Sequence, residues 1–213
     1  LKNQQRPKNN LFNTDHQGLR ELLSLGYVFI KLIYYNISIK EESYWVNQSI
    51  SIDNIDAFIF DFDGVLTNNQ VHIDQHGKEW VSCSRSDGLA FDVLRILKKP
   101  AYIISTEKNS VVTARAEKLQ IHAFQGINDK TKIIKTLEDE YGYSVDRLLY
   151  VGNDLNDYKA IELCGFSACP ADSHRIIKNK SDLTLNTCGG KGVVRELLED
   201  IFKIDFFDVL YRG

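Results

Sequence analysis

Methionine is absent from the 213 residues, and the sequence starts at Leu1. We therefore expect a piece of a longer product or an unusual start. Cysteine is scarce: there are four, with no CxxC pair and no metal-finger spacing. This excludes a disulfide framework or a zinc finger as the basis of the fold. We expect reduced thiols, mostly packed as small hydrophobic residues, in a cytoplasmic protein.

An excess of positive charge is also missing. Lys and Arg number 26 against 29 Asp and Glu, which gives a formal net charge of −3. No basic field attracts nucleic acid or anionic lipid, so we expect no nucleic-acid partner. The longest apolar-looking stretch, residues 22–35, falls short of the roughly 20 apolar residues that span a bilayer, so we expect no membrane partner. A phosphate-binding site must draw its positive charge from local residues.

The sequence changes character near residue 53. Residues 1–53 show a helix-like segment at 17–25, a strand-like segment at 27–33 and a short helical one at 41–46. We interpret them as an N-terminal extension or the remnant of an upstream domain. Residues 54–213 alternate short apolar strands with amphipathic helices. This alternation predicts an α/β domain with a mostly parallel sheet and helices on both faces.

The expected elements of this domain follow from apolar spacing and from turn residues. Strands are expected at residues 57–60, 101–104, 147–151, 166–168 and 183–185. Helices are expected at residues 88–98, 110–119, 130–141, 155–163 and 192–202. Val71–Ile73 and Trp80–Ser82 flank a turn and predict a β-hairpin.

Chemically reactive residue types follow three of the expected strands. Residue 60 is followed by DFDGVLT (residues 61–67), residue 104 by STE (105–107) and residue 151 by GNDLND (152–157). Lys130 opens the helix between the last two of these strands. Ligands of such sheets bind beyond the carboxyl ends of the strands. We therefore expect these residues to converge on one site.

The pattern favours metal-assisted phosphoryl transfer. Clustered carboxylates repel one another and need a cation, and Mg²⁺ prefers oxygen ligands. One carboxylate can attack phosphorus and form an aspartyl-phosphate. A second, two residues on, lies on the same side of an extended chain and can protonate the leaving alcohol. Lys130, the Ser105 hydroxyl and Mg²⁺ would stabilise the transferred group. Helix caps and turns are the alternative reading of such aspartates.

These segments resemble the four motifs of the haloacid dehalogenase-like (HAD) phosphatase superfamily, over about residues 55–202. The resemblance implies the Rossmann-like HAD fold, with the hairpin in place of a cap domain. Further segments resemble the small capless sugar-acid phosphatases: residues 86–88, 115–119, 124–126, 165–172 and 189–192. That group includes 3-deoxy-D-manno-octulosonate 8-phosphate phosphatases, ketodeoxynononate (KDN) and sialate 9-phosphate phosphatases, and the phosphatase-like domain of CMP-sialate synthetases.

The resemblance implies roles for single residues. Asp61 would be the nucleophile and a Mg²⁺ ligand. Asp63 would be the general acid and base, with its backbone carbonyl on the metal. Ser105 and Lys130 would hold the phosphoryl oxygens. Asn153 stands where the family usually has an aspartate as the third metal ligand, and Asp154 is the alternative ligand.

The resemblance also suggests a substrate-binding set: Ser86, Asp87, Gly88, Thr106, Glu107, Arg115 and Lys118. Octulosonate phosphatases tend to carry arginine at the places of Ser86 and Glu107. Glu107 and Lys118 instead resemble the nine-carbon branch, and Lys118 or Arg115 would pair with the sugar carboxylate. A helix turn for Glu107 and a solvated helix face for the two basic residues are the alternatives.

Three functions stay open on this evidence. The first is a Mg²⁺-dependent phosphatase for a nonulosonate 9-phosphate, of the KDN or sialate type. The second is the same chemistry on octulosonate 8-phosphate. The third is a non-catalytic oligomerisation domain of a CMP-sialate synthetase, although the intact Asp61 and Asp63 argue against it. A phosphoacceptor receiver domain does not explain residues 61–67 or the hairpin. The resemblance further implies a homotetramer, with Val71 and Trp80 at a subunit interface.

Overall fold

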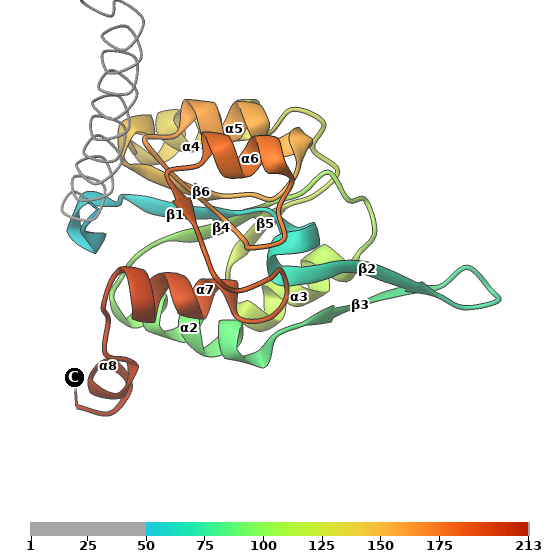
Figure 1. Cartoon of the computed structure of the whole chain (residues 1–213), viewed down its shortest axis with the longest axis horizontal. Coiled ribbons are helices and arrows are strands. Elements are labelled where there is room, and N and C mark those ends of the chain that lie inside the picture. The colour runs from blue at the N-terminus through green and yellow to red at the C-terminus, as the bar shows by residue number, and fades with distance from the viewer. Residues whose placement is uncertain (1–49, 213) are drawn as a thin grey trace, which may run out of the picture. The chain divides into compact units, whose positions relative to one another are not determined.

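The computed structural model describes residues 50–212, and the elements expected before residue 50 lie outside the described residues. Within this part, six strands form a sheet in the order β5-β4-β1-β6-β7-β8, and every neighbouring pair is parallel (Figure 1). The strands are β1 (Ala57–Phe60), β4 (Ala101–Ile104), β5 (His122–Phe124), β6 (Leu148–Val151), β7 (Phe166–Cys169) and β8 (Leu183–Thr184). The predicted parallel α/β sheet is confirmed.

Helices cover both faces of this sheet, as the alternation of elements predicted. Side chains of β1 alternate between the faces: Phe58 and Phe60 pack in one cluster, and Ala57 and Ile59 in the other. The first face carries α2 (Arg85–Ile96), α3 (Val111–Leu119), α7 (Val193–Glu196), η5 (Leu197–Ile201) and α8 (Phe206–Tyr211). The second carries α4 (Lys130–Tyr141), α5 (Tyr158–Leu163) and α6 (Arg175–Lys180). Strand β1 is therefore apolar at every position.

The strand register places the reactive segments side by side. Phe60 pairs with Ile103 of β4 and with Val151 of β6, so these three strands end at nearly the same level. The residues that follow them are Asp61, Ser105 and the 152–157 segment. The sheet thus gathers them at its carboxyl edge, as expected.

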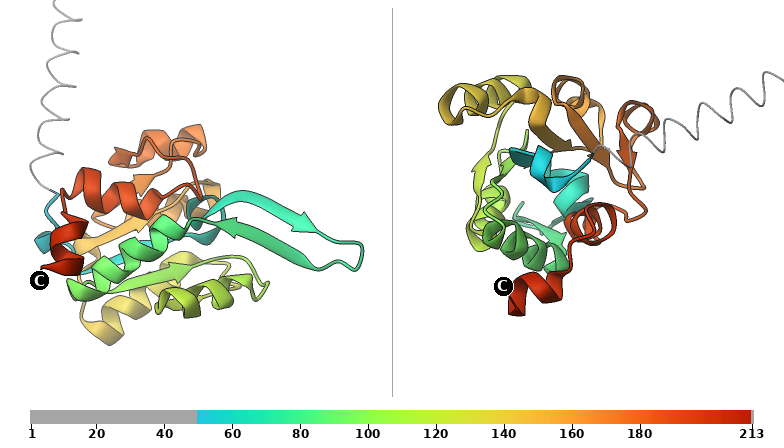
Figure 2. Two further views of the ribbon diagram at one scale, coloured as in Figure 1. Left: turned by 90° about the horizontal axis from the view of Figure 1, so that it is seen from below. Right: turned by 90° about the vertical axis from the view of Figure 1, so that its left-hand side faces the viewer.

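The predicted hairpin exists and is longer than the sequence suggested. It consists of β2 (Thr67–Ile73) and β3 (Glu79–Cys83), and it extends away from the sheet (Figure 2). Asp74 stabilises the turn, because its Oδ1 accepts hydrogen bonds from the backbone of His76 and Lys78. The rings of His72 and Trp80 stack on one face of the ribbon.

Several expected boundaries differ from the structure. Helix α2 begins at Arg85 rather than Gly88, because the Ser84 hydroxyl accepts a hydrogen bond from the Ser86 amide and Asp87 suits the first turn. The short elements β5, α6 and α8 were not anticipated. The remaining turns are η1 (Ile52–Asn54), η2 (Phe62–Leu66), η3 (Val145–Arg147) and η4 (Leu155–Asp157).

Two further findings concern the helices and the cysteines. Among residues 50–212, no helix has both the length and the apolar character needed to cross a membrane. The four cysteines are free thiols: Cys164 and Cys169 are buried, Cys83 is half-buried and Cys188 is exposed.

Candidate active site

Asp61 is the first residue after β1, and the sheet itself holds it in place. Its backbone N–H donates to the carbonyl of Val151 at 2.9 Å. Its carboxylate is buried, and Oδ1 accepts hydrogen bonds from the Phe62 amide at 2.8 Å and from Lys130 Nζ at 2.7 Å. Burial raises the pKa of Asp61, the negative charge of Asp157 adds to this effect, and Lys130 opposes it. A cation beside Asp61 would favour its ionised form.

Lys130 lies at the start of α4, directly after Asp129, whose side chain accepts a hydrogen bond from the Thr131 amide. The Nζ atom of Lys130 bridges two carboxylates, at 2.7 Å from Asp61 and 2.6 Å from Asp157. Burial disfavours the charged amine, but the two carboxylates outweigh it and raise the pKa of Lys130. The lysine therefore brings a fixed positive charge to the site.

Asp157 is central to this arrangement, although the sequence pattern alone predicted no separate role for it. It is fully buried, and Oδ1 accepts hydrogen bonds from Lys130 Nζ and, at 2.7 Å, from the Tyr150 hydroxyl. Its Oδ2 accepts the backbone amides of Asn153 at 2.8 Å and Asp154 at 3.2 Å. Lys130 could have indicated this role from the sequence, because a buried lysine needs carboxylate partners and residues 152–157 contain two aspartates.

The tight turn of this loop comes after the second aspartate. Asp61 (φ −67°, ψ 164°) and Asp63 (φ −79°, ψ 119°) have extended backbone, and Gly64 follows at a φ of 84° within η2. That the two carboxylates share a side of the chain stays a prediction. Thr67 Oγ1 accepts from the Gly64 amide at 3.2 Å and donates to Asp63 Oδ1 at 3.4 Å.

The environment of Asp63 suits a general acid. This carboxyl is half-buried. Burial raises its pKa, and the negative charge of Glu107 raises it further. A raised pKa keeps more of the acid protonated near neutral pH, which is the form that donates a proton.

Asn153 provides the observation that bears on a metal. Its side chain is buried, and Oδ1 has no hydrogen-bond partner. A buried amide oxygen without a partner is costly unless a ligand satisfies it. Asp154 is exposed, and its Oδ1 accepts from the Leu155 amide. The oxygen of Asn153 and the carboxylate of Asp61 are ligands that suit Mg²⁺.

The donor set of this site is mixed. Within residues 50–212, no group of three or more His, Cys, Asp and Glu side chains is placed to hold a metal ion. Asp61, Asp63 and Asp154 therefore form no such group. A cation here would depend on the amide oxygen of Asn153 and on a backbone carbonyl, as the resemblance implied for Asp63. The residues present fit such a site.

The segment after β4 forms its own turn. Ser105 is buried, and its Oγ accepts from the Glu107 amide at 3.0 Å. Glu107 Oε1 in turn accepts from the Lys108 and Asn109 amides, at 2.6 and 2.7 Å. Thr106 is exposed. Glu107 precedes α3 and does not lie in its first turn, so the helix-turn alternative is wrong.

A cavity of about 310 Å³ adjoins Asp63 and lies between the hairpin and the start of α3. Three carboxyl groups line it, those of Asp63, Glu79 and Glu107, and no Lys or Arg does. Its other lining residues are Asn69, Gln70, Val71, Val81 and Val111. This cavity can take hydroxyl groups, and it disfavours an anion.

The remaining substrate-binding candidates form a separate cluster. Asp87 is buried, and its Oδ1 accepts the backbone amides of Val194 at 2.9 Å and Arg195 at 3.3 Å. Burial raises the pKa of Asp87 to about 6. Arg115 Nη2 donates to the Ser84 carbonyl at 2.7 Å. These contacts join α2, α3 and α7, and a role in substrate binding stays a prediction.

Three more candidates of that set have few polar contacts. Ser86 Oγ lies 2.5 Å from the Ser84 hydroxyl. Gly88 lies within α2, beside Leu119. Lys118 is exposed on α3.

The glycine-rich segment 189–192 packs against the loop that carries Asp61. The Gly190 amide donates to the Val65 carbonyl at 2.9 Å, and the Gly189 amide donates to Asp172 Oδ1 at 2.9 Å. A Cβ atom on Gly189 would collide with the Gly64 carbonyl. The amides of Gly189 and Gly190 already donate to acceptors within the protein, so this segment packs tightly against the loop after Asp61 and these two amides do not bind a ligand.

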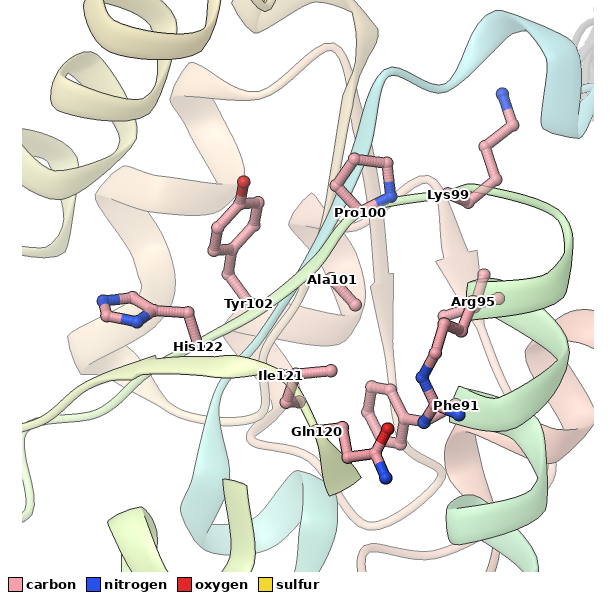
Figure 3. Close-up of a pocket in the computed structure, with 10 residues that line it drawn as sticks. Phe91, Arg95, Lys99, Pro100, Ala101, Tyr102, Gln120, Ile121 and His122 are labelled. Carbon is pink, nitrogen blue, oxygen red and sulfur yellow. The ribbon is translucent and has the colours of Figure 1, made fainter. Parts of the chain in front are cut away.

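A second pocket, of about 230 Å³, lies at the other end of the strands (Figure 3). Residues from α2, from the start of β4 and from the start of β5 line it, including Arg95, Ala101, Gln120 and His122. Asp61 and Lys130 do not. The reactive residues thus belong to the carboxyl edge alone.

Comparison with protein families and with curated proteins agrees with this geometry. Residues 97–197 match the family model of haloacid dehalogenase-like hydrolases. The 3-deoxy-D-manno-octulosonate 8-phosphate phosphatase of Haemophilus influenzae is 32% identical over 153 residues, which cover 71% of this chain and 85% of that protein.

Solved structures are similar to most of this chain. A protein from Streptomyces avermitilis, named as a HAD family hydrolase, shares 38% identity at a TM-score of 0.71, covering 74% of this chain and 90% of that one. The octulosonate 8-phosphate phosphatase of Moraxella catarrhalis, solved with magnesium, phosphate and the sugar acid, shares 30% identity at a TM-score of 0.70, with 74% and 90% covered.

Proposed function

Because the chain belongs to the haloacid dehalogenase-like hydrolase family, we propose that it is a Mg²⁺-dependent phosphomonoester hydrolase of the 3-deoxy-D-manno-octulosonate 8-phosphate phosphatase type. One observation carries the proposal. The Lys130 amine bridges Asp61 and Asp157, and Asp157 also accepts a hydrogen bond from the backbone amide of Asn153, whose buried side-chain oxygen is unpaired. The carboxyl edge of the sheet thus carries a buried nucleophile (Asp61), a fixed positive charge (Lys130) and an amide oxygen that suits Mg²⁺ (Asn153).

The chain's own residues account for both chemical steps. Asp61 attacks phosphorus, an Asp61 O–P bond forms, and the ester P–O bond breaks. Asp63 donates its proton to the leaving alcohol. It then takes a proton from the water that attacks the aspartyl-phosphate, and phosphate leaves Asp61. The Phe62 amide and Lys130 hold Oδ1 of Asp61, which leaves Oδ2 for the attack.

The remaining groups stabilise charge. Lys130 and the Ser105 hydroxyl would face the phosphoryl oxygens. A bound Mg²⁺ would neutralise negative charge on the phosphoryl group. We propose Asp61, the Asp63 carbonyl and Asn153 as the groups that hold it. Asn153 is preferred to Asp154, because the latter is exposed and caps η4.

Two substrates fit this chemistry. The relatives named above support 3-deoxy-D-manno-octulosonate 8-phosphate. A nonulosonate 9-phosphate, of the KDN or sialate type, is the second candidate. The carboxylates of Glu107 and Glu79 beside Asp63 favour it, because they suit the hydroxyl groups of a longer sugar tail.

The proposal includes the organisation of the chain. We take residues 54–213 as the phosphatase domain, and a homotetramer in the cytoplasm as its working form. Val71, Ile73 and Trp80 are exposed on the hairpin, which favours burial against another subunit. The free cysteines agree with a reducing compartment.

Phosphate release tests the proposed function. The purified protein is offered octulosonate 8-phosphate and nonulosonate 9-phosphates, with Mg²⁺ or with EDTA, and Asp61→Asn is the control. We expect Mg²⁺-dependent turnover that the control loses. A folded protein that releases no phosphate from any of these esters would favour the non-catalytic oligomerisation domain.

A further inference from the structure

Tyr150 lies in the middle of the sheet, and its hydroxyl reaches the catalytic residues. It belongs to β6, where it pairs with Ile59 of β1 on one side and with Ser167 of β7 on the other. Its side chain is fully buried. The hydroxyl donates to Oδ1 of Asp157 at 2.7 Å. We propose that Tyr150 is a positioning residue, which orients Asp157 and through it Lys130 for phosphoryl transfer.

The inference rests on the proposed function and on how Asp157 divides its contacts. Its Oδ2 accepts two backbone amides and thereby holds the loop of Asn153. Its Oδ1 accepts both Lys130 Nζ and the Tyr150 hydroxyl. Tyr150 is thus the second donor to the oxygen that binds the lysine, and it fixes the plane of the carboxylate.

The direction of this hydrogen bond is set by burial. Burial raises the pKa of Tyr150 well above its usual value, and the negative charges of Asp157 and Asp61 raise it further. The hydroxyl therefore keeps its proton and acts as the donor to Asp157. The hydrogen bond from Tyr150 partly neutralises the negative charge on Oδ1 of Asp157 and so weakens its attraction for Lys130. The Nζ atom of Lys130 therefore stays between Asp157 and Asp61.

A purely structural explanation makes a different prediction. Tyr150 also packs in the apolar cluster on the α4 side of the sheet. If it only fills this core, phenylalanine serves equally well in the folded enzyme. If its hydroxyl positions Asp157, phenylalanine keeps the packing and loses the orientation of Lys130.

The chain offers a matched control in Tyr102. This tyrosine lies on β4, belongs to the same cluster and is also buried. Its hydroxyl lies 3.0 Å from that of Tyr143, and the hydrogen bonds of the Lys130 and Asp157 side chains go to other residues. Tyr102→Phe therefore removes a buried hydroxyl from the same side of the sheet without touching the site.

The experiment compares Tyr150→Phe, Tyr102→Phe and wild type in Mg²⁺-dependent phosphate release, with the folded fraction taken from thermal melts. We expect Tyr150→Phe to lower kcat about tenfold per folded molecule and to leave KM within about twofold, because the lysine acts on the transferring group. We expect Tyr102→Phe to change neither. A kcat of Tyr150→Phe within twofold of wild type, or a loss that follows the folded fraction, overturns the inference. A wild type that hydrolyses no ester refutes the proposed function instead.

Discussion

The side-chain amide of Asn153 lies in the space that a Cβ atom on Gly64 would occupy. Gly64 also has a φ of 84°, a backbone angle that residues other than glycine rarely adopt. The turn that carries Asp63 and the loop that carries Asn153 thus approach closely because residue 64 has no side chain. This contact holds the side-chain amide of Asn153 against the loop that follows Asp61.

Gly64→Ala should therefore displace Asn153 and reduce activity. The new methyl group collides with the Asn153 amide, and positive φ adds about 1 kcal/mol of strain. A shift of about 1 Å in a catalytic group can cost about 100-fold in rate, and we expect a loss of that order in kcat/KM. Phosphate release and calorimetric Mg²⁺ titration measure it.

Gly142→Ala is the control for this variant. Gly142 ends α4 at a φ of 73°, with open space around its Cβ position. Gly142→Ala therefore introduces the same backbone strain as Gly64→Ala but no collision with a neighbouring side chain. If both variants lost stability and activity equally, strain alone would account for the loss, and the packing of Asn153 on Gly64 would be irrelevant to catalysis.

Asn153→Asp should strengthen Mg²⁺ binding at a cost to the metal-free protein. The variant adds a carboxylate at a buried position, in the loop whose backbone amide binds the buried Asp157 and at the same sheet edge as the buried Asp61. Without a cation the repulsion should lower the free energy of unfolding by about 2 kcal/mol. With Mg²⁺ the added charge should lower the dissociation constant about tenfold. Calorimetric titration and urea unfolding, with and without Mg²⁺, measure both effects. An unchanged affinity would indicate that Asn153 is not a ligand.

Much of this site was accessible from the sequence because strand ends are easy to locate. Four apolar residues before Asp61 mark a buried strand, and the apolar runs before Ser105 and residue 152 mark two more. Parallel strands share an edge, so their following residues had to meet there. The parallel sheet and the convergence of Asp61 and Lys130 followed from this pattern alone.

The contacts that the sequence did not reveal join different elements of the fold. Tyr150 lies only seven residues before Asp157, but in the sequence it looks like any apolar strand residue, and only the fold shows that its hydroxyl reaches that carboxylate. The contacts of Asp87 with the amides of Val194 and Arg195 span more than a hundred residues, so local patterns carry no information on them. A role of Asp87 in substrate binding stays a prediction.

Asp87 should leave a signature in the dependence of stability on pH. Burial raises its pKa to about 6 in the folded state, against 3.8 for an unperturbed aspartate. The folded state therefore binds this proton more tightly, so its stabilising contribution is complete below about pH 4 and is lost as the pH rises through 6. The shift corresponds to about 3 kcal/mol. Asp87→Asn removes the titration.

Urea unfolding of the wild type and of Asp87→Asn, from pH 4 to pH 7.5, checks this expectation. The variant should gain stability relative to the wild type between pH 4 and 6, and the difference should level off above about pH 7. A difference that stays constant over the whole range would mean that Asp87 does not titrate there.

Glu107→Arg should shift the preference between the two candidate substrates. Glu107 lines the acidic cavity beside Asp63. The resemblance to the sugar-acid phosphatases suggests arginine at this place in the octulosonate branch. Replacing a negative by a positive charge should favour the substrate whose carboxylate lies closer to the phosphate ester, which is the eight-carbon acid. We expect the ratio of kcat/KM values, octulosonate over nonulosonate, to rise about tenfold, or about 1.4 kcal/mol. Glu117→Arg makes the same charge change at an exposed position of α3 and should leave the ratio unchanged. If both variants gave the same ratio of kcat/KM values, Glu107 would not determine which substrate the enzyme prefers.

Trp80→Glu should dissociate the proposed homotetramer. Trp80 is 47% exposed on the projecting hairpin, on the face where its ring stacks on His72. If this ribbon packs against another subunit, a carboxylate there is buried without a partner and weakens association. Light scattering should then give a tetramer for wild type and a smaller species for Trp80→Glu. Tyr211→Glu, at a more exposed aromatic residue of α8, should remain a tetramer. If wild type and Trp80→Glu have the same mass, the face of the hairpin that carries Trp80 is not the subunit interface.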